Sequence, residues 1–380
     1  MDSWIVVKSE ERKIIDFFGD FLKHGVLMKS LFRKEVLQMK AYHLERPLCD
    51  VKLNQNELPR DIPSAIKSQV LVRFVQTPWN RYSKPYSEDL CERVAAAVGW
   101  KSEGVTMANG SNVLIQALIL SAAVRQVVMT VAPTFSLYRL EAQALGNRVV
   151  EVPLLKDFSL PKDDFLRTMR IKKPSIIFLS NPNAPTGNLF PEEILIEIIE
   201  KAPGLVVVDE AYYPFSGKTL LPALQQYKNL VLLRTFSKAF ALAGVRAGYL
   251  LAHPSVVKEV RKVLLPYCLN VLSQIVVETL LEQVVLVQKW VMESLGERER
   301  LFEGLQCVPD VSPFPSAANF ICFRVKGAKK TFKGLLEQGV LVRDVSDNKL
   351  LKNCLRVSVG TAEENARFLQ ALKFLSRPPL

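Results

Sequence analysis

The chain has 380 residues, of which 49% are hydrophobic and 23% charged, and its formal net charge is +12. This length predicts two domains, since single domains usually have about 100–200 residues. The composition excludes disordered and collagen-like proteins. The longest uncharged stretch, residues 104–124, contains several polar side chains, so we expect no membrane-spanning segment. The positive charge is spread along the chain, which suits an anionic substrate or cofactor, although nucleic acid could use it as well.

The six cysteines and three histidines are scattered along the chain and form no CxxC pair. Zinc sites need closely spaced ligands, so we expect no metal. A disulfide scaffold is not expected in a chain of this size, which favours the reducing cytoplasm. The mixed charges of the first residues also argue against a secretory signal.

Residues 8–40 carry apolar side chains at helical spacing and predict an amphipathic helix. Such a helix would pack on its own domain or, alternatively, cover another subunit or a membrane surface. From about residue 100, short apolar runs alternate with helical stretches. The candidate strands are Gly104–Ala108, Val127–Val131, Ser175–Leu179, Leu205–Val208, Leu230–Leu233 and Arg246–Ala252. Apolar runs separated by helices indicate a mainly parallel sheet covered on both faces.

A long helical stretch at 255–305 leads to a second, α+β unit. Its candidate strands are Ala318–Phe323, Val340–Arg343 and Cys354–Val359, followed by a helix over 361–376. The predicted organisation is an amino-terminal helical extension (1–38), an arm joining the small domain (39–75), a large domain (76–270) and a small carboxy-terminal domain (271–380).

Polar residues cluster where five of the predicted strands end. These clusters are at 109–112, 133–135, 181–183, 209–212 and 235–238. Ligands of parallel α/β folds bind at the carboxyl ends of the strands, so we expect the site there. A lysine after a strand is commonly a surface residue. Lys238, however, lies among small residues and eight positions before Arg246, which makes it a candidate Schiff-base nucleophile, because burial and a nearby cation lower the pKa of an amine.

The neighbouring residues suit a phosphate and a cationic ring. Thr235, Ser237 and Arg246 could donate to one phosphate dianion, and residues 110–112 open a helix whose backbone N–H groups could cap it. Asp209 ends an apolar strand, 29 positions before Lys238. A buried carboxylate there needs a cationic partner, and a protonated pyridine nitrogen would be one.

Four segments carry a resemblance to a known family: SNPNAPTG (180–187), VVVDEAYYPF (206–215), RTFSKAFALAGVRAGY (234–249) and CLRVSVGT (354–361). They resemble the fold-type-I aminotransferases that depend on pyridoxal 5'-phosphate, most closely the histidinol-phosphate branch. The resemblance covers about residues 39–376. It implies an α/β large domain, with a mainly parallel sheet and helices on both faces, and a smaller α+β domain.

The implied reaction converts L-histidinol phosphate and 2-oxoglutarate to imidazole acetol phosphate and L-glutamate, in histidine biosynthesis. An aromatic amino acid aminotransferase of the same branch and a threonine-phosphate decarboxylase remain alternatives. A DNA-binding regulator on this fold needs a separate domain, for which about 38 additional residues are too few, so we expect no nucleic-acid partner.

The resemblance also implies roles for single residues. Lys238 would bind the cofactor and move the substrate's proton, and Asp209 would pair with the pyridinium nitrogen. Asn183 and Tyr212 would hydrogen-bond the ring oxygen, while Phe135 would stack on the ring in place of the more usual tyrosine. The residues expected at the cofactor phosphate are Gly110, Ser111, Asn112, Thr235, Ser237 and Arg246.

Tyr82 corresponds to a tyrosine that reaches the cofactor phosphate of the neighbouring subunit, which implies an obligatory homodimer with a shared site. The alternative for Tyr82 is a surface turn. The residues expected to bind the anionic substrate are Tyr42, Asn56, Arg343 and Arg356. Two arginines suit a phosphate monoester or a dicarboxylate, and the alternative for Arg343 is a surface salt bridge.

Overall fold

The computed structural model describes residues 31–39 and 47–376 of the chain. Most of the helix predicted over 8–40, and Tyr42, therefore lie outside the described residues. Within 31–39, the short helix α3 (Lys34–Leu37) packs beside α7 (Leu137–Ala144). There the Arg33 guanidinium donates to the Ala144 carbonyl at 2.5 Å, at the negative end of the α7 dipole.

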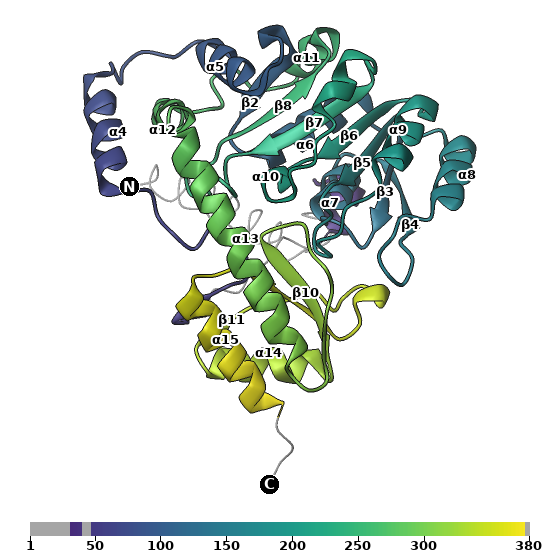
Figure 1. The fold of residues 1–380 in the computed structure, drawn as a ribbon. Helices are drawn as coiled ribbons and strands as arrows, with labels where there is room; N and C mark the ends of the chain where they lie inside the picture. The colour runs from purple at the N-terminus through teal and green to yellow at the C-terminus, as the bar shows by residue number, and fades with distance from the viewer. Residues whose placement is uncertain (1–30, 40–46, 377–380) are drawn as a thin grey trace, which may run out of the picture.

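A seven-stranded sheet with the order β2-β8-β7-β6-β5-β3-β4 forms the centre of the larger unit (Figure 1). Its strands are β2 (Val105–Ala108), β3 (Val127–Ala132), β4 (Arg148–Pro153), β5 (Ile176–Ser180), β6 (Leu205–Asp209), β7 (Leu230–Thr235) and β8 (Gly248–Ala252). β8 is antiparallel to β2 and β7, and every other neighbouring pair is parallel, so the mainly parallel sheet is confirmed. The strand β4 was not predicted, because it is an edge strand whose exposed charged residues interrupt the apolar pattern.

Both faces of this sheet are covered, because its strands are apolar at consecutive positions and successive side chains point to opposite faces. In β5, Phe178 points to one face and Leu179 to the other. The helices on the Phe178 face are α6 (Ser111–Ala122), α7 and α11 (Pro254–Arg261). Those on the Leu179 face include α8 (Lys162–Lys172), α9 (Glu192–Lys201) and α12 (Val271–Leu281).

The smaller unit is built on a four-stranded antiparallel sheet with the order β12-β13-β10-β9. Its strands are β9 (Val311–Pro313), β10 (Phe320–Val325), β12 (Arg343–Asp344) and β13 (Cys354–Ser358), and its helices are α14 (Ala328–Glu337) and α15 (Ala362–Leu375). The predicted strand over 340–343 is divided, because β11 (Val340–Leu341) leaves this sheet and pairs in parallel with β1 (Val51–Lys52).

The helical stretch predicted over 255–305 consists of three separate helices, α11, α12 and α13 (Val284–Gln306). Asn270 caps the start of α12, since its side chain accepts a hydrogen bond from the Ser273 N–H, and this cap fixes the break between α11 and α12. The long helix α13 runs from the larger unit down beside α15 (Figure 1).

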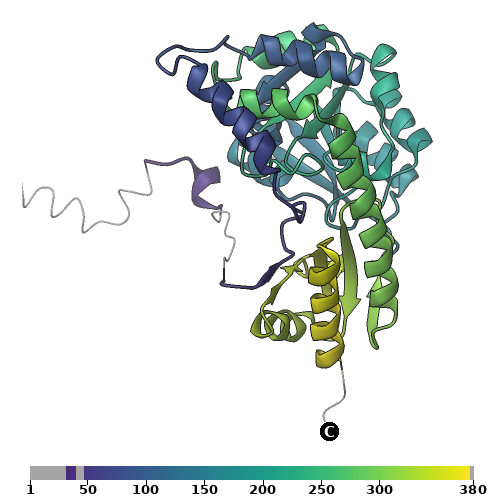
Figure 2. The same cartoon turned by 60° about the vertical axis from the view of Figure 1, so that its left-hand side comes forward.

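An extended arm joins the two units at the front of the molecule. From β1 at the smaller unit the chain passes up to α4 (Ser64–Gln76), which packs on α12 of the larger unit (Figure 2). The arm therefore crosses from one unit to the other between residues 53 and 63, next to the site described below.

Among the described residues, no single helix is both apolar enough and long enough to cross a membrane. α12 and α13 satisfy that criterion as a pair, across a bend of 81°, by length and composition alone.

Candidate active site

The predicted polar clusters share one edge of the seven-stranded sheet. β2 is parallel to β7, because both are antiparallel to β8, which lies between them. The segments that follow β2, β3, β5, β6 and β7 therefore begin at the same edge, where ligands of such folds bind.

Lys238 follows β7 and is half-buried at this edge. Its Nζ donates to the Gln55 carbonyl of the arm at 2.8 Å and lies 5.8 Å from the centre of the Tyr212 ring. Burial lowers the pKa of Lys238 to about 7, and the nearby Arg356 lowers it too, against the opposing effect of Glu57. A substantial fraction of this amine is therefore neutral near pH 7, as a nucleophile or a proton acceptor must be.

Asp209, the last residue of β6, is buried and has both carboxylate oxygens bonded. The Tyr138 hydroxyl donates to Oδ2 at 2.7 Å, and the Ala211 N–H donates to Oδ1 at 3.0 Å. Burial raises the pKa of Asp209 to about 6, and the hydrogen bonds from Tyr138 and Ala211 act in the opposite direction. An ionised carboxylate held in this way suits a cationic ring nitrogen.

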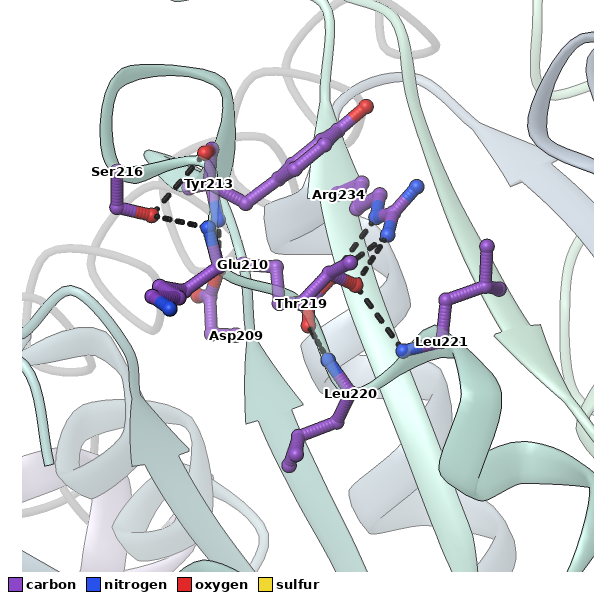
Figure 3. A network of polar contacts seen from close by, with 10 residues as sticks. Asp209, Glu210, Tyr213, Ser216, Thr219, Leu220, Leu221 and Arg234 are labelled. Carbon is purple, nitrogen blue, oxygen red and sulfur yellow. Dashed lines mark hydrogen bonds and ion pairs between the residues drawn. The ribbon is translucent and has the colours of Figure 1, made fainter. Parts of the chain in front are cut away.

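Glu210 points to the opposite face of the sheet from Asp209, where it forms an ion pair with Arg234 at the end of β7 (Figure 3). Both side chains are only 2% exposed, and their closest N–O distance is 2.8 Å. Thr219 bonds to both partners, and the Leu220 N–H donates to the second Glu210 oxygen at 2.7 Å. This network joins the end of β6, whose last residue is Asp209, to the end of β7, which precedes Lys238.

A cradle for a phosphate lies where α6 begins. Gly110 precedes α6 with a φ of +88°, and no side chain caps the first N–H groups of this helix in the part of the chain described. The positive φ strains any other residue at position 110, and a Cβ there would lie 2.5 Å from Arg246 Nη2, so the guanidinium would have to move away. The same guanidinium donates to the Ser237 hydroxyl at 3.3 Å, and the Thr235 hydroxyl donates to Ser237 at 2.9 Å.

The donors of this cradle are helix N–H groups, two hydroxyls and a guanidinium. That set fits a phosphate dianion, so the residues present fit the phosphate of pyridoxal 5'-phosphate. Ser111 is half-buried in the first turn of α6, while Asn112 is exposed there. Arg246 itself has a φ of +59°, a conformation that a non-glycine residue adopts at a cost and that often marks functional sites.

Asn183 is fully buried, and its amide is engaged within the protein. Nδ2 donates to the Pro133 carbonyl at 3.0 Å and to Thr186 Oγ1 at 2.7 Å. Its Oδ1 accepts from the Thr134 hydroxyl at 2.7 Å. Both amide protons are thus in use, and Asn183 would have to exchange one of these bonds to reach a ring oxygen.

Three consecutive arm residues each contact a predicted site residue on another element. The Asn54 carbonyl accepts from Arg356 Nη2 at 2.9 Å, and the Gln55 carbonyl accepts from Lys238. Asn56 donates from Nδ2 to the Tyr212 hydroxyl at 2.9 Å. Because this hydroxyl accepts from Asn56 and burial raises its pKa, it stays protonated and can donate to a further oxygen.

Arg356 and Arg343 lie opposite each other on β13 and β12. The Arg356 guanidinium lies 5.2 Å from the centre of the Phe320 ring, and its charge lowers the pKa of Lys238. The two arginines that the sequence predicts for substrate binding therefore lie on neighbouring strands, and Arg356 is close to Lys238.

Phe135 and Tyr82 lie farther from these contacts. Phe135 is partly exposed after β3, and its ring meets Tyr138 edge to face at a centroid distance of 5.5 Å. Tyr82 is 85% exposed, with its ring 4.7 Å from that of Tyr267. Among the described residues of this chain, no hydrogen bond joins Tyr82 to the residues of the phosphate cradle.

Four residues of this site were not predicted from the sequence: Tyr138, Arg234, Asn54 and Gln55. The first two had a usable signal. Tyr138 follows Phe135 by three positions at the start of an amphipathic helix, and Arg234 is a charge at the end of an otherwise apolar strand. Asn54 and Gln55 act through backbone carbonyls, which side-chain patterns do not reveal.

The fold is that of solved enzymes of fold type I that use pyridoxal 5'-phosphate. The histidinol-phosphate aminotransferase of Sinorhizobium meliloti, solved in complex with pyridoxal 5'-phosphate, matches with a TM-score of 0.82 and 21% identity. That match covers 91% of this chain and 97% of the other. At this identity the similarity establishes the fold.

The family follows from the sequence comparisons. The model of the family "Aminotransferase class I and II" matches residues 50–372. The chain is 36% identical to the histidinol-phosphate aminotransferase of Deinococcus radiodurans, over 90% of this chain and 95% of the relative. It is 40% identical to that of Chlorobaculum tepidum, over 86% of this chain and 94% of the relative. The chain therefore belongs to the class I and II aminotransferases, and pyridoxal 5'-phosphate is its cofactor.

Proposed function

We propose that this protein is a histidinol-phosphate aminotransferase, which transfers the amino group of L-histidinol phosphate to 2-oxoglutarate and so acts in histidine biosynthesis. The observation that carries the proposal is the pair Arg343 and Arg356, which lie opposite each other on neighbouring strands, with Arg356 close enough to Lys238 to lower the pKa of its amine. Two guanidiniums suit the phosphate of the donor and the second carboxylate of 2-oxoglutarate equally well. The names of the relatives at 36% and 40% identity support the same substrate.

Lys238 is the base of the proposed reaction. When bound, pyridoxal 5'-phosphate supplies an electron sink that makes the substrate Cα–H acidic. The Lys238 Nζ would accept the proton from the substrate Cα and deliver it to C4′ of the cofactor, which its pKa of about 7 permits near neutral pH. The Gln55 carbonyl, 2.8 Å away, orients this amine.

Asp209 keeps the ring nitrogen protonated by supplying a negative charge at a buried position. Gly110, Ser111, Asn112, Thr235, Ser237 and Arg246 hold the cofactor phosphate, the first three mainly through the backbone at the start of α6. Tyr212 donates to the ring oxygen, and Asn183 does so if it exchanges one of its internal bonds. Phe135 packs on the ring without adding a hydroxyl.

The substrate's anionic end lies between Arg343 and Arg356 in this proposal. Asn56 contributes indirectly, because it fixes the Tyr212 hydroxyl and, through its carbonyl, accepts from Asn319 at 3.1 Å. Tyr42 is proposed to complete the same pocket on the basis of the family resemblance.

We further propose that the protein is a homodimer in which Tyr82 reaches the cofactor phosphate of the neighbouring subunit. Exposed apolar side chains on and after α4 support a protein partner: Leu71, Val72, Val75 and Trp79. Two-fold symmetric dimers are the commonest oligomers, and Tyr82 lies three residues beyond Trp79.

The cytoplasm is the proposed compartment. All six cysteines lie in the described residues, and none of them forms a disulfide. Free thiols of this number suit a reducing environment.

The test is a substrate-profile assay on the purified holoenzyme with 2-oxoglutarate as acceptor. L-Histidinol phosphate should yield L-glutamate with a higher kcat/KM than phenylalanine or tyrosine. Preference for the aromatic amino acids would reassign the protein to an aromatic aminotransferase. Carbon dioxide release from O-phosphothreonine, without glutamate, would reassign it to a decarboxylase.

A further inference from the structure

Tyr138 occupies an unusual position beneath the site. It lies in the first turn of α7 and is fully buried, with its ring stacked on Phe178 of β5 at a centroid distance of 4.9 Å and an angle of 11°. The edge contact with Phe135, described above, adds a second aromatic neighbour. These two contacts, with Phe178 and with Phe135, fix the orientation of the Tyr138 ring and therefore the direction in which its hydroxyl points.

That direction is toward Asp209. The alternation of side chains along β6 sends Asp209 to the same face of the sheet as Val207, which is the face that α7 covers. The Tyr138 hydroxyl therefore meets Oδ2 at 2.7 Å, and it is a donor, because burial and the Asp209 charge raise its own pKa well above the usual value. The backbone N–H of Ala211 occupies the other carboxylate oxygen.

We propose that Tyr138 is a positioning residue that acts through Asp209, holding the carboxylate ionised and in one orientation for the ring nitrogen of the cofactor. The inference rests on the proposed function only as far as the use of pyridoxal 5'-phosphate, and it is independent of the amino donor. A carboxylate placed in an apolar environment tends to take up a proton unless donors stabilise its charge. Only two donors are bonded to Asp209 in the described residues, and Tyr138 is the one that a side-chain substitution can remove.

The proposal has a consequence for the strength of cofactor binding at acidic pH. Below the pKa of Asp209 the carboxyl is neutral and attracts the pyridinium less strongly. Loss of the Tyr138 donor raises that pKa further, so the weakening of cofactor binding on acidification begins at a higher pH. Phe135 and the phosphate cradle are unaffected, since the phenylalanine ring of a Tyr138→Phe variant keeps both aromatic contacts.

The experiment measures the dissociation constant of pyridoxal 5'-phosphate for apo-protein from pH 5 to pH 9, in wild type and Tyr138→Phe. We expect the constant at pH 7 to rise about tenfold in Tyr138→Phe, the equivalent of one hydrogen bond to a charged group. We also expect the acid limb of the profile, the range in which the constant increases as the pH falls, to move to higher pH. The matched control is Tyr227→Phe, because the Tyr227 hydroxyl also donates to a carboxylate, that of Glu200, at 2.7 Å, but on the exposed surface. This control should match the wild type in both respects.

A double-variant comparison separates action through Asp209 from a general structural effect. Asp209→Asn alone should weaken binding, and adding Tyr138→Phe to it should cause little further loss. The inference would be overturned if Tyr138→Phe caused the same loss of cofactor affinity with Asp209 as with Asn at position 209. It would also be overturned if the acid limb of Tyr138→Phe did not move.

A second variant covers the case in which Tyr138→Phe fails to fold. A fluorinated tyrosine incorporated at position 138 is the more acidic, stronger donor with nearly the same shape. It should move the acid limb to lower pH, opposite to the phenylalanine variant, and a limb that does not move would contradict the proposal. If none of these proteins, wild type included, binds pyridoxal 5'-phosphate, the function itself fails instead.

Discussion

Arg343 and Arg356 are cross-strand partners, placed opposite each other by the antiparallel register of β12 and β13. Like charges in this arrangement destabilise a sheet unless something offsets their repulsion. An anionic substrate group that binds between two guanidiniums would do so, which makes the pair a specific target for kinetic tests.

Replacing either arginine by glutamine should mainly raise the KM for L-histidinol phosphate. The expected loss in kcat/KM corresponds to about 2–4 kcal/mol, the range for one charged hydrogen-bonded pair. Comparison with L-histidinol, which has no phosphate, provides the readout, since the variants should lose most of the preference for the phosphorylated donor. Arg324→Gln is the control, because Arg324 lies on β10 in the same sheet and donates to the Leu350 carbonyl. An unchanged preference in both variants would place the anion site elsewhere.

The amine of Lys238 should react with pyridoxal 5'-phosphate faster as the pH rises, and the rate should level off above a midpoint near pH 7. The neutral amine is the reactive form, and burial together with Arg356 lowers the pKa of Lys238 to about 7. The measurement is the rate at which the cofactor's absorbance changes after mixing with apo-protein at each pH. Arg356→Met removes a neighbouring positive charge and should therefore shift the midpoint upward.

Two results would contradict this assignment. A midpoint near the usual lysine value of about 10.4 would mean that Lys238 is solvated rather than enclosed. Formation of the same absorbance change by Lys238→Ala would mean that another amine reacts. Lys218→Ala, at an exposed position beyond the site, serves as the control and should behave as wild type.

Shared active sites in a homodimer predict complementation between two inactive variants. Lys238→Ala removes the reacting amine of its own site, and Tyr82→Ala removes a contact from the site of the neighbour. Mixed dimers of the two then contain one intact site, so random mixing should restore about a quarter of wild-type activity, since half of the dimers are hybrids with one active site of two. The assay is turnover after the two proteins are unfolded together and refolded.

The control for this prediction is a mixture of Lys238→Ala with Asp209→Ala, because each of these substitutions alters the site of its own subunit. In that mixture each hybrid site retains one defect, so activity should stay at background. Absence of complementation in the first mixture, with dimers confirmed by mass, would show that Tyr82 serves its own subunit or none.

The ion pair between Glu210 and Arg234 should make a large contribution to stability. Glu210→Gln leaves the Arg234 charge buried without its counterion, which typically costs about 3–5 kcal/mol. Chemical denaturation of the apo-protein measures the free energy of unfolding directly. Arg167→Gln is the matched control, because Arg167 and Asp164 form a pair at the same 2.8 Å distance on the exposed surface. Its expected cost is under about 1 kcal/mol, and equal effects of the two substitutions would contradict the argument.

Much of the architecture could be predicted from the order of residue types. Consecutive apolar residues in five strands of the larger sheet, each followed by polar residues, indicated a parallel sheet and the edge at which Lys238 and Asp209 meet. The edge strand β4 could not be predicted from this pattern, because only one of its six side chains is buried. The break between α11 and α12 escaped it because a polar cap at Asn270 resembles a residue on the exposed face of a continuous helix.

The reactive residues of the site could be predicted from local sequence. A lysine after a strand, a carboxylate at the end of a neighbouring strand and a glycine before a helix each have a recognisable sequence context. Contacts between distant segments were decided only by the tertiary structure. The carbonyls of Asn54 and Gln55 meet Arg356 and Lys238, which lie about 180–300 positions away along the chain, and backbone groups leave no mark on composition. The pKa of about 7 at Lys238 and the hydrogen bond from Tyr138 to Asp209 were likewise decided by the tertiary structure. The burial of the amine and the orientation of the Tyr138 hydroxyl exist only after the helices and strands have packed.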